Sequence, residues 1–278
     1  MKKRFVPIIL SVFLLFTGCS TNTDTSSIAS NLSSETASVT SSKPVLVLPT
    51  TENTSGKVQI QTVSACDGSY LFNSYIITSS KGESVVVDPT RMPRKNIIDL
   101  NPAAIVSTHG HPDHIDPGFT DLYDSKKNFY TKEDFNTNDF HIYTMYSSHS
   151  SDLVNETTGN VIIVLEVDGL RIAHMGDIGQ TKLTAEQLKA LGNIDIAFMQ
   201  FQNSYSDMSL ENEKGFKLIE QLNPKIVIPT HYTALAFPII EKKYGKITEY
   251  NNILQISKED LPEKALTFYH ILNTHSYY

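Results

Sequence analysis

The stretch Thr108-His109-Gly110-His111-Pro112-Asp113-His114 places three histidines and one aspartate within six consecutive positions, although the whole chain has only nine histidines. The apolar run of residues 103–107 directly before it is short, and it predicts a buried strand. Gly110 and Pro112 interrupt an extended chain, so we expect the histidines on a loop at the C-terminal end of that strand. This is the end at which α/β sheets carry their functional groups.

The spacing within the stretch predicts two adjacent metal positions. Alternate residues of an extended chain share one face, so we expect His109, His111 and Asp113 to converge. His114 is out of phase with them and is expected to point to a neighbouring position. Imidazole and carboxylate groups are common protein ligands of zinc and of other transition metals. The alternative is a polar turn in which the histidines occur by chance.

The stretch resembles the H-x-H-x-D-H signature of the metallo-β-lactamase superfamily, whose members use it to hold one or two metal ions, usually zinc. The resemblance can be followed through most of the chain after about Lys57. It implies an α/β fold, a four-layer αββα sandwich of two mixed β-sheets with helices outside. It also implies a metal-dependent hydrolase, with the folded domain at residues 57–278.

Further motifs follow in the order that the resemblance implies. The strand predicted at residues 141–146 leads to His149, which we expect to be the third histidine of the first site; His141, at the start of that strand, is the competing choice. A hairpin predicted around Asp168-Gly169 runs into Gly176-Asp177. The strand at residues 226–228 leads into Pro-Thr-His231-Tyr. By resemblance the ligands are His109, His111 and His149 for the first metal, Asp113, His114 and His231 for the second, and Asp177 for both.

This ligand set implies hydrolytic chemistry. Two divalent ions, with Zn²⁺ as first choice and manganese or iron as alternatives, would lie ~3.5–4 Å apart. A water between them becomes hydroxide near neutral pH and is the expected nucleophile. We expect Asp113 and His231 to take part in catalysis as well as in metal binding. The net positive charge of such a centre favours a small anionic substrate with an ester, lactone or phosphodiester bond.

Several residues near these motifs are candidates for supporting roles. Asp88 follows a strand predicted at residues 84–87. It is expected to support the histidine-rich loop at residues 108–114, called the metal loop below, or to serve only as a turn residue before Pro89. The layout from Gln202, Asn203 and Tyr205 to the last histidine resembles the small hydrolases near the ascorbate-phosphate lactonases. These three side chains are candidate substrate contacts, or simply a polar loop.

Other segments have simpler interpretations. We expect a helix that begins at a capping box on Thr184 and ends near Gly192, and a second helix at residues 209–222. Residues 115–139 lack clear periodicity, so we expect them either to rim the site or to carry little regular structure. His174 lies in a predicted strand and is interpreted as a packed histidine or as one that supports a ligand, rather than as a further imidazole ligand. His270 and His275 are interpreted as surface residues of the C-terminal tail.

The first nineteen residues predict export. A basic segment, Met1–Arg4, precedes an apolar run of about a dozen residues that is too short to span a bilayer comfortably. Phe16-Thr17-Gly18-Cys19 resembles the lipobox of bacterial lipoproteins, which implies a signal peptide at residues 1–18 and an acylated Cys19 anchored in the cell membrane. The alternative is an ordinary signal peptide with a chance cysteine. Residues 19–56 are then a lipidated, Ser/Thr-rich flexible tether, in which residues 45–48 are either tether or a first edge strand.

Composition excludes other classes of function. Without Lys2, Lys3 and Arg4 the chain keeps 20 basic and 30 acidic side chains, a formal net charge of −10. Such a chain lacks the basic surface that grips a polyanion, so no nucleic-acid partner is expected and a nuclease is disfavoured. Cys66 is the only other cysteine, which rules out an internal disulfide if Cys19 is acylated. The remaining alternative is a non-catalytic lipoprotein that uses its metal site to bind a ligand.

Overall fold

The computed structural model describes residues 53–65, 74–94 and 98–275, all of which belong to the unit Pro44–Tyr278. The expectations for the signal peptide, Cys19, residues 45–48 and Cys66 therefore lie outside the described residues. Among the helices that the structure does describe, none combines the length and the apolar composition that a bilayer crossing needs.

The first sheet has six strands and carries the histidine-rich loop. Strands β1 to β3 and β13 pair in antiparallel fashion, whereas β4 and β5 join parallel to β3, so the sheet is mixed. In spatial order its strands are β13 (Ile253–Ile256), β1 (Val58–Thr62), β2 (Tyr75–Thr78), β3 (Ser84–Val87), β4 (Ala104–Ser107) and β5 (Lys126–Phe129).

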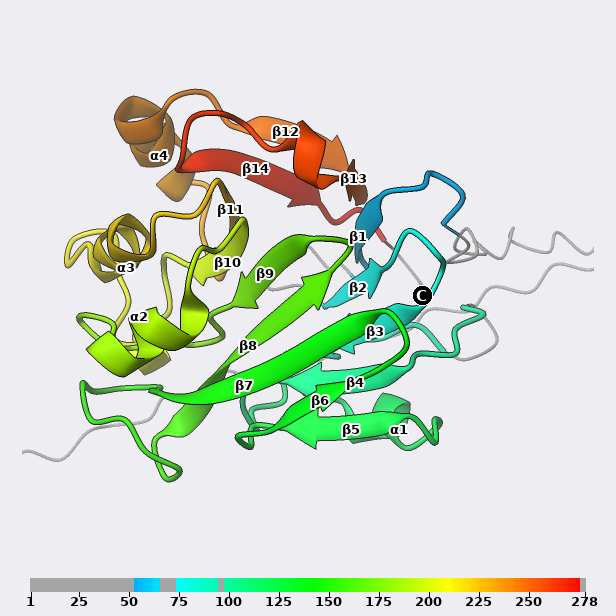
Figure 1. Cartoon of the computed structure of the whole chain (residues 1–278). Helices are drawn as coiled ribbons and strands as arrows, with labels where there is room; N and C mark the ends of the chain where they lie inside the picture. Colours follow the sequence, from blue (N-terminus) through cyan, green and yellow to red (C-terminus); the bar gives the residue numbers. More distant parts are fainter. Residues whose placement is uncertain (1–52, 66–73, 95–97, 276–278) are drawn as a thin grey trace, which may run out of the picture. The chain divides into compact units, whose positions relative to one another are not determined.

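The second sheet has eight strands and is also mixed (Figure 1). Its half made of β9 to β12 and β14 is parallel, and its half made of β6 to β9 is antiparallel. In spatial order its strands are β12 (Thr248–Asn251), β14 (Thr267–Leu272), β11 (Ile226–Thr230), β10 (Ile196–Gln200), β9 (Leu170–His174), β8 (Gly159–Val167), β7 (Phe140–Ser148) and β6 (Asp134–Asn136).

Alternation of side chains along the strands creates the central core. Val85 and Val87 of the first sheet share one buried cluster with Ile163 and Leu165 of the second, because every other residue of a strand faces the same side. The opposite face of the second sheet is apolar as well. It packs under the helices α2 (Ala185–Leu191), α3 (Lys214–Leu222) and α4 (Ala236–Tyr244).

The outer layer over the first sheet is thinner. In the described part of the chain its only helix is α1 (Pro117–Thr120), whose Phe119 packs with Ile76 and Ile105 of the sheet. Two short 3₁₀ turns, η1 (Ser204–Ser206) and η2 (Lys258–Asp260), complete the regular structure. The αββα sandwich of two mixed sheets, predicted from the sequence, is thus confirmed.

The expectations that rest on short sequence motifs are confirmed. Thr184 and Gln187 form the predicted capping box of α2, and Gly192 ends that helix with φ +60°. Asp168 and Gly169 join β8 to β9 in the expected hairpin, both with positive φ. Positive φ at two central residues is what a two-residue hairpin turn requires.

Two expectations were wrong. Residues 115–139 contain α1, β5 and β6 rather than little structure, although Ile115, Asp116 and Pro117 line the cleft over the ligands, in line with the other alternative. The helix expected from Ser209 begins only at Lys214, because Glu213 has φ +57° and cannot belong to a right-handed helix.

Candidate metal centre

The predicted ligands come from loops that leave four strands at one edge of the sandwich. His109, His111, Asp113 and His114 follow β4, whereas His149 follows β7. Asp177 lies three residues after β9, and His231 directly follows β11. The strands β7 to β11 lie side by side in one sheet (Figure 1), with β8 between β7 and β9. The loop after β4 joins this sheet through the hydrogen bond from Val161 N to Thr108 O, 2.8 Å.

The seven side chains form two groups that share one carboxylate. His109, His111, His149 and Asp177 make the first group. Asp113, His114, His231 and Asp177 make the second. Within each group the candidate ligand atoms all lie within 4.8 Å of one another. All seven residues that the sequence indicated are brought together in this arrangement.

The distances around Asp177 have the scale of a metal coordination shell. Its Oδ2 lies 3.5 Å from His109 Nε2 and 3.6 Å from His149 Nε2. Its Oδ1 lies 3.3 Å from His114 Nε2 and 3.2 Å from His231 Nε2. Ligand atoms at about 2.0–2.1 Å from a tetrahedral ion are separated by roughly 3.3–3.4 Å. The carboxylate therefore presents one oxygen to each group.

Several of these atoms are buried without a hydrogen-bond partner. Among the described residues, His109 Nε2, His149 Nε2 and Asp177 Oδ1 belong to this class. Leaving such an atom unpaired costs on the order of 1–3 kcal/mol. Several unpaired atoms in one place therefore indicate a ligand that binds there. The two imidazole nitrogens belong to the first group and Asp177 Oδ1 faces the second, so the donor atoms of both groups fit a divalent ion.

Asp88 fixes the metal loop from beneath. Its Oδ1 accepts a hydrogen bond from Thr108 N at 2.7 Å, and its Oδ2 lies 2.7 Å from His114 Nδ1. A carboxylate on the distal ring nitrogen orients an imidazole so that its other nitrogen faces a metal. Burial alone would raise the pKa of Asp88, but His114 and His174 beside it hold that pKa below its usual value.

The electrostatics of the cluster favour a cation. Burial alone would lower the pKa of His114, but Asp88 and Asp177 on its two ring nitrogens raise it to about 10. A metal ion on Nε2 would take the place of that proton, because the same carboxylates stabilise either positive charge. Burial, together with the charge of His114, lowers the pKa of His109 to about 2, so this imidazole stays neutral and its lone pair is free for a metal.

A glycine and an asparagine position the shared carboxylate. Gly176 has φ +57°, and a Cβ there would lie 2.5 Å from Asn160 Oδ1 and 2.6 Å from Thr108 Cβ. Asn160 accepts a hydrogen bond from Asp177 N at 3.0 Å and donates to Met175 O at 3.1 Å. Sequence reasoning missed Asn160, because it lies in β8 and has no local motif that points to Asp177.

Comparison with known proteins identifies the family. Residues 69–231 match the family model of the β-lactamase superfamily domain, and this span ends on the last histidine of the cluster. The chain belongs to this superfamily. The resemblance seen in the sequence is thereby confirmed.

Two curated relatives of this superfamily member are matched over most of their own length. It is 29% identical over 211 residues to a UPF0173 metal-dependent hydrolase of Staphylococcus carnosus, covering 61% of this chain and 85% of the relative. It is 28% identical over 210 residues to one of Lysinibacillus sphaericus, covering 63% and 87%. A structure from Thermotoga maritima, described as a candidate Zn-dependent hydrolase of the superfamily, has 19% identity and a TM-score of 0.55, covering 77% of this chain and all of that one. It shows that the fold is shared.

The three candidate substrate contacts of this superfamily member have different surroundings. Asn203 points into the cluster, where its Nδ2 donates to Asp177 Oδ2 at 2.6 Å. Gln202 instead turns to the loop after His231 and accepts from Thr233 N at 2.9 Å. Tyr205 is 82% exposed and lines the open cleft over the ligands. Of the three, Tyr205 is thus the side chain that remains accessible to a substrate at the cleft.

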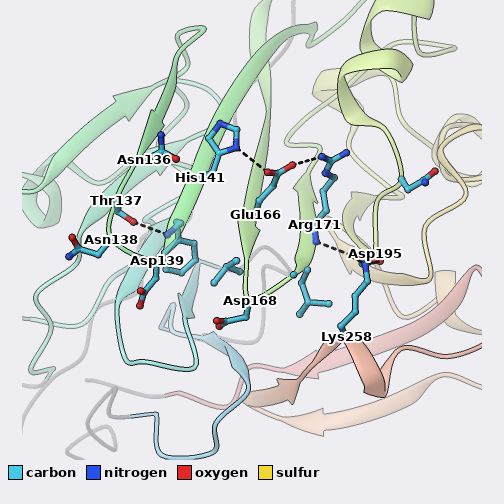
Figure 2. A pocket seen from close by; sticks show the side chains of 15 residues that line it. Asn136, Thr137, Asn138, Asp139, His141, Glu166, Asp168, Arg171, Asp195 and Lys258 are labelled. Carbon is cyan, nitrogen blue, oxygen red and sulfur yellow. Dashed lines mark hydrogen bonds and ion pairs between the residues drawn. The ribbon is translucent and has the colours of Figure 1, made fainter.

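The remaining histidines lie outside the cluster. His141 is at the opposite end of β7, in a pocket with Glu166 and Arg171 (Figure 2). His174 is buried and stacks on Phe198, as expected of a packed histidine. The prediction that His270 and His275 lie on the surface was wrong.

Both C-terminal histidines are buried through long-range contacts. His270 Nε2 lies 2.5 Å from the Tyr232 hydroxyl, because β14 pairs beside β11. His275 Nε2 contacts Thr62 O at 2.7 Å, which ties the end of the chain to β1.

Proposed function

We propose that this protein is a hydrolase that uses two divalent metal ions, with Zn²⁺ as the first choice. The observation that carries the proposal is the pair of ligand groups around Asp177, with its buried and unpartnered nitrogen and oxygen atoms. The curated relatives are described as metal-dependent hydrolases, which agrees with it. His109, His111 and His149 would hold the first ion, Asp113, His114 and His231 the second, and Asp177 both.

Two ions bound there would lower the pKa of a water molecule between them and so supply hydroxide near neutral pH. Asp177, fixed by Asn160 and Asn203, would keep the two groups at a constant separation. Asp113 is only partly buried, so its carboxylate would lie beside the substrate and orient the attacking oxygen. His231 completes the second group.

The proposed substrate is a small anionic molecule with an ester, lactone or phosphodiester bond. Two ions carry a charge of +4, and Asp113 and Asp177 offset only half of it. Fixed positive charge stabilises both an anionic group of the substrate and the oxyanion that develops during hydrolysis. No such positive excess exists over the chain as a whole, whose formal net charge is −7.

Metal counting combined with a turnover screen tests this proposal. Protein purified without chelator should contain more than one metal equivalent and should hydrolyse at least one of a set of phosphodiesters, lactones, thioesters and β-lactams. His231→Ala should lower the second equivalent while largely sparing the first, and His141→Ala, at the other end of β7, should change neither. Activity that survives exhaustive chelation would overturn the metal-dependent mechanism.

The proposed location is the outer face of a bacterial cell membrane, with the chain anchored through acylated Cys19. The order of basic segment, apolar run and Phe16-Thr17-Gly18-Cys19 supports it. Cys19→Ala should release the protein or leave an unprocessed precursor in a fractionation experiment, whereas Cys66→Ala should behave as wild type. Unchanged processing and membrane attachment of Cys19→Ala would refute acylation.

A further inference from the structure

The cleft over the two ligand groups has a volume of about 820 Å³. It is lined by the ligands Asp113 and Asp177 and by Ile115, Pro117 and Tyr205, which add apolar surface. Small-molecule sites have volumes of roughly 300–1,000 Å³ and combine such apolar surface with a few polar groups that orient the ligand. The cleft therefore has room for the bond to be cleaved and for an apolar body attached to it.

The side chain of Tyr205 is accessible at this cleft. It is 82% exposed, the largest exposed fraction among the large hydrophobic residues that the structure describes. Neither its ring nor its hydroxyl has a hydrogen-bonding, ionic or aromatic partner among the described residues. Single exposed hydrophobic residues are common on protein surfaces and by themselves indicate nothing. Tyr205 differs from them because it lines the cleft that contains the metal ligands, where its ring is available to a bound molecule.

The backbone of Tyr205 is tied to the shared ligand. Asn203 Nδ2 donates to Asp177 Oδ2 at 2.6 Å, and Asn203 Oδ1 accepts from Tyr205 N at 3.0 Å. A single amide group therefore connects the carboxylate that both ligand groups share to the residue that carries the ring. The ring thus has a fixed attachment point beside the metal ligands.

The turn η1, which carries Tyr205, also packs against a ligand loop. A Cβ at Gly179 would lie 2.6 Å from Ser206 O and closer still to His149 O, so only glycine fits between η1 and the loop of His149. Ser206 is buried, and its Oγ accepts a hydrogen bond from Gln200 Nε2 at 2.9 Å. The backbone that carries the ring is therefore held in place before a substrate binds, which lowers the entropy cost of the contact.

We propose that Tyr205 is a specificity-determining residue whose ring stacks on an aromatic group of the substrate. This inference rests on the proposed hydrolase function. It specifies the substrate class as a small molecule in which an aromatic ring lies close to the ester, lactone or phosphodiester bond. Two aromatic rings in offset or edge-to-face contact gain more than the burial of their area alone provides. A puckered aliphatic ring of similar size lacks that gain, so Tyr205 should distinguish between the two.

Two trifluoroethyl esters provide a matched test. The phenylacetate and the cyclohexylacetate share the ester bond and a leaving group without an aromatic ring, and they differ in a flat or a puckered ring. With metal-loaded, full-length protein and a pH indicator for the released acid, Tyr205→Leu should lower the ratio of kcat/KM for phenylacetate over cyclohexylacetate by about fivefold. Tyr205→Phe keeps the ring and should therefore keep the wild-type ratio.

The matched control is Tyr250→Leu, which removes a tyrosine ring from β12 at the edge of the second sheet, outside the cleft lining. A ratio that is unchanged in Tyr205→Leu, or equally lowered in Tyr250→Leu, would overturn the inference. If the wild-type protein hydrolyses neither ester, the proposed activity loses support, and calorimetric titration with phenylphosphonate and cyclohexylphosphonate decides the inference. Wild type should bind phenylphosphonate more tightly and Tyr205→Leu should lose that preference. A preference that is absent from wild type, or retained in the variant, would contradict the stacking contact.

Discussion

Histidines and carboxylates lie at both ends of β7, β9 and β10, but at one end some of their atoms lack hydrogen-bond partners, whereas at the other end they are paired. At the ligand end, His109 Nε2 and His149 Nε2 are buried without hydrogen-bond partners. At the other end lies a pocket of about 640 Å³ (Figure 2), in which His141 contacts Glu166 at 3.0 Å and Asp134 at 2.8 Å. Each charged side chain that the structure describes in that pocket has an ionic or hydrogen-bonding partner, as Asp195 has in Lys258.

The comparison shows that a concave, charged surface alone does not indicate a reaction site. The far pocket has more charged side chains, but each of them already has a partner within the protein, so they offer little to a ligand. The ligand end keeps buried nitrogen and oxygen atoms without hydrogen-bond partners close together. The free energy that this arrangement costs would be offset by metal binding. Substitutions at the ligand end should therefore affect metal binding and kcat, whereas substitutions in the far pocket should affect only the free energy of unfolding.

The largest effect is expected for Asp113→Asn at the ligand end. The change removes one negative charge from the second group and leaves the attacking oxygen poorly oriented. Misplacement of about 1 Å costs on the order of a hundredfold in rate, so kcat should fall by about that factor. His109, His111 and His149 are unchanged, so at least one metal equivalent should remain.

The measurement is kcat with a substrate from the turnover screen, together with metal content and circular dichroism. Asp121→Asn, an exposed carboxylate just after α1, is the matched control and should keep normal kcat. An Asp113→Asn variant that keeps near-normal kcat would show that the carboxylate is dispensable.

A smaller effect is expected for Asn203→Ala. The amide donates to Asp177 Oδ2 at 2.6 Å, and the loss of a group that orients a ligand typically weakens metal affinity by about 10–100-fold. Competition with a fluorescent chelator would measure this affinity. Ser204→Ala, an exposed neighbour, is the control. Equal affinities of the two variants would limit Asn203 to a role in its own loop.

Sequence predicts the ligands because each lies in a loop that leaves the end of a strand. His109, His149 and His231 stand at strand ends with recognisable apolar runs before them. Their supporting partners are not predictable in this way. Asn160 and Asp177 are seventeen positions apart, and their contact depends on the pairing of β8 with β9.

Segments without an apolar pattern are also missed. β5 is an edge strand with the sequence Lys-Lys-Asn-Phe, in which only Asn128 is fully buried, so no alternation of apolar residues indicates it. The burial of His270 has a similar origin. It follows from β14 pairing with both β11 and β12, which no local pattern specifies.

The smallest effect is expected at the far end, for His141→Gln. Hydrogen bonds to Glu166 and Asp134 raise the pKa of His141 above its usual value. A raised pKa means that the folded protein binds the proton more tightly, so this stabilisation is complete below about pH 6.5 and is lost as pH rises through the folded-state pKa. Because the side chain is 36% exposed, the difference in free energy of unfolding should stay under about 1 kcal/mol.

Urea unfolding of wild type and His141→Gln at pH 5.5 and pH 9 provides the measurement. The difference between the two proteins should be larger at pH 5.5 and should shrink with added salt, and protonation of the metal ligands cancels because both proteins contain them. Metal content and kcat at neutral pH should match wild type, since His141 is at the opposite end of β7 from His149. A loss of metal or of kcat in His141→Gln would contradict the distinction between the two ends. It would show that the hydrogen bonds of His141 also influence the metal ligands at the other end of β7.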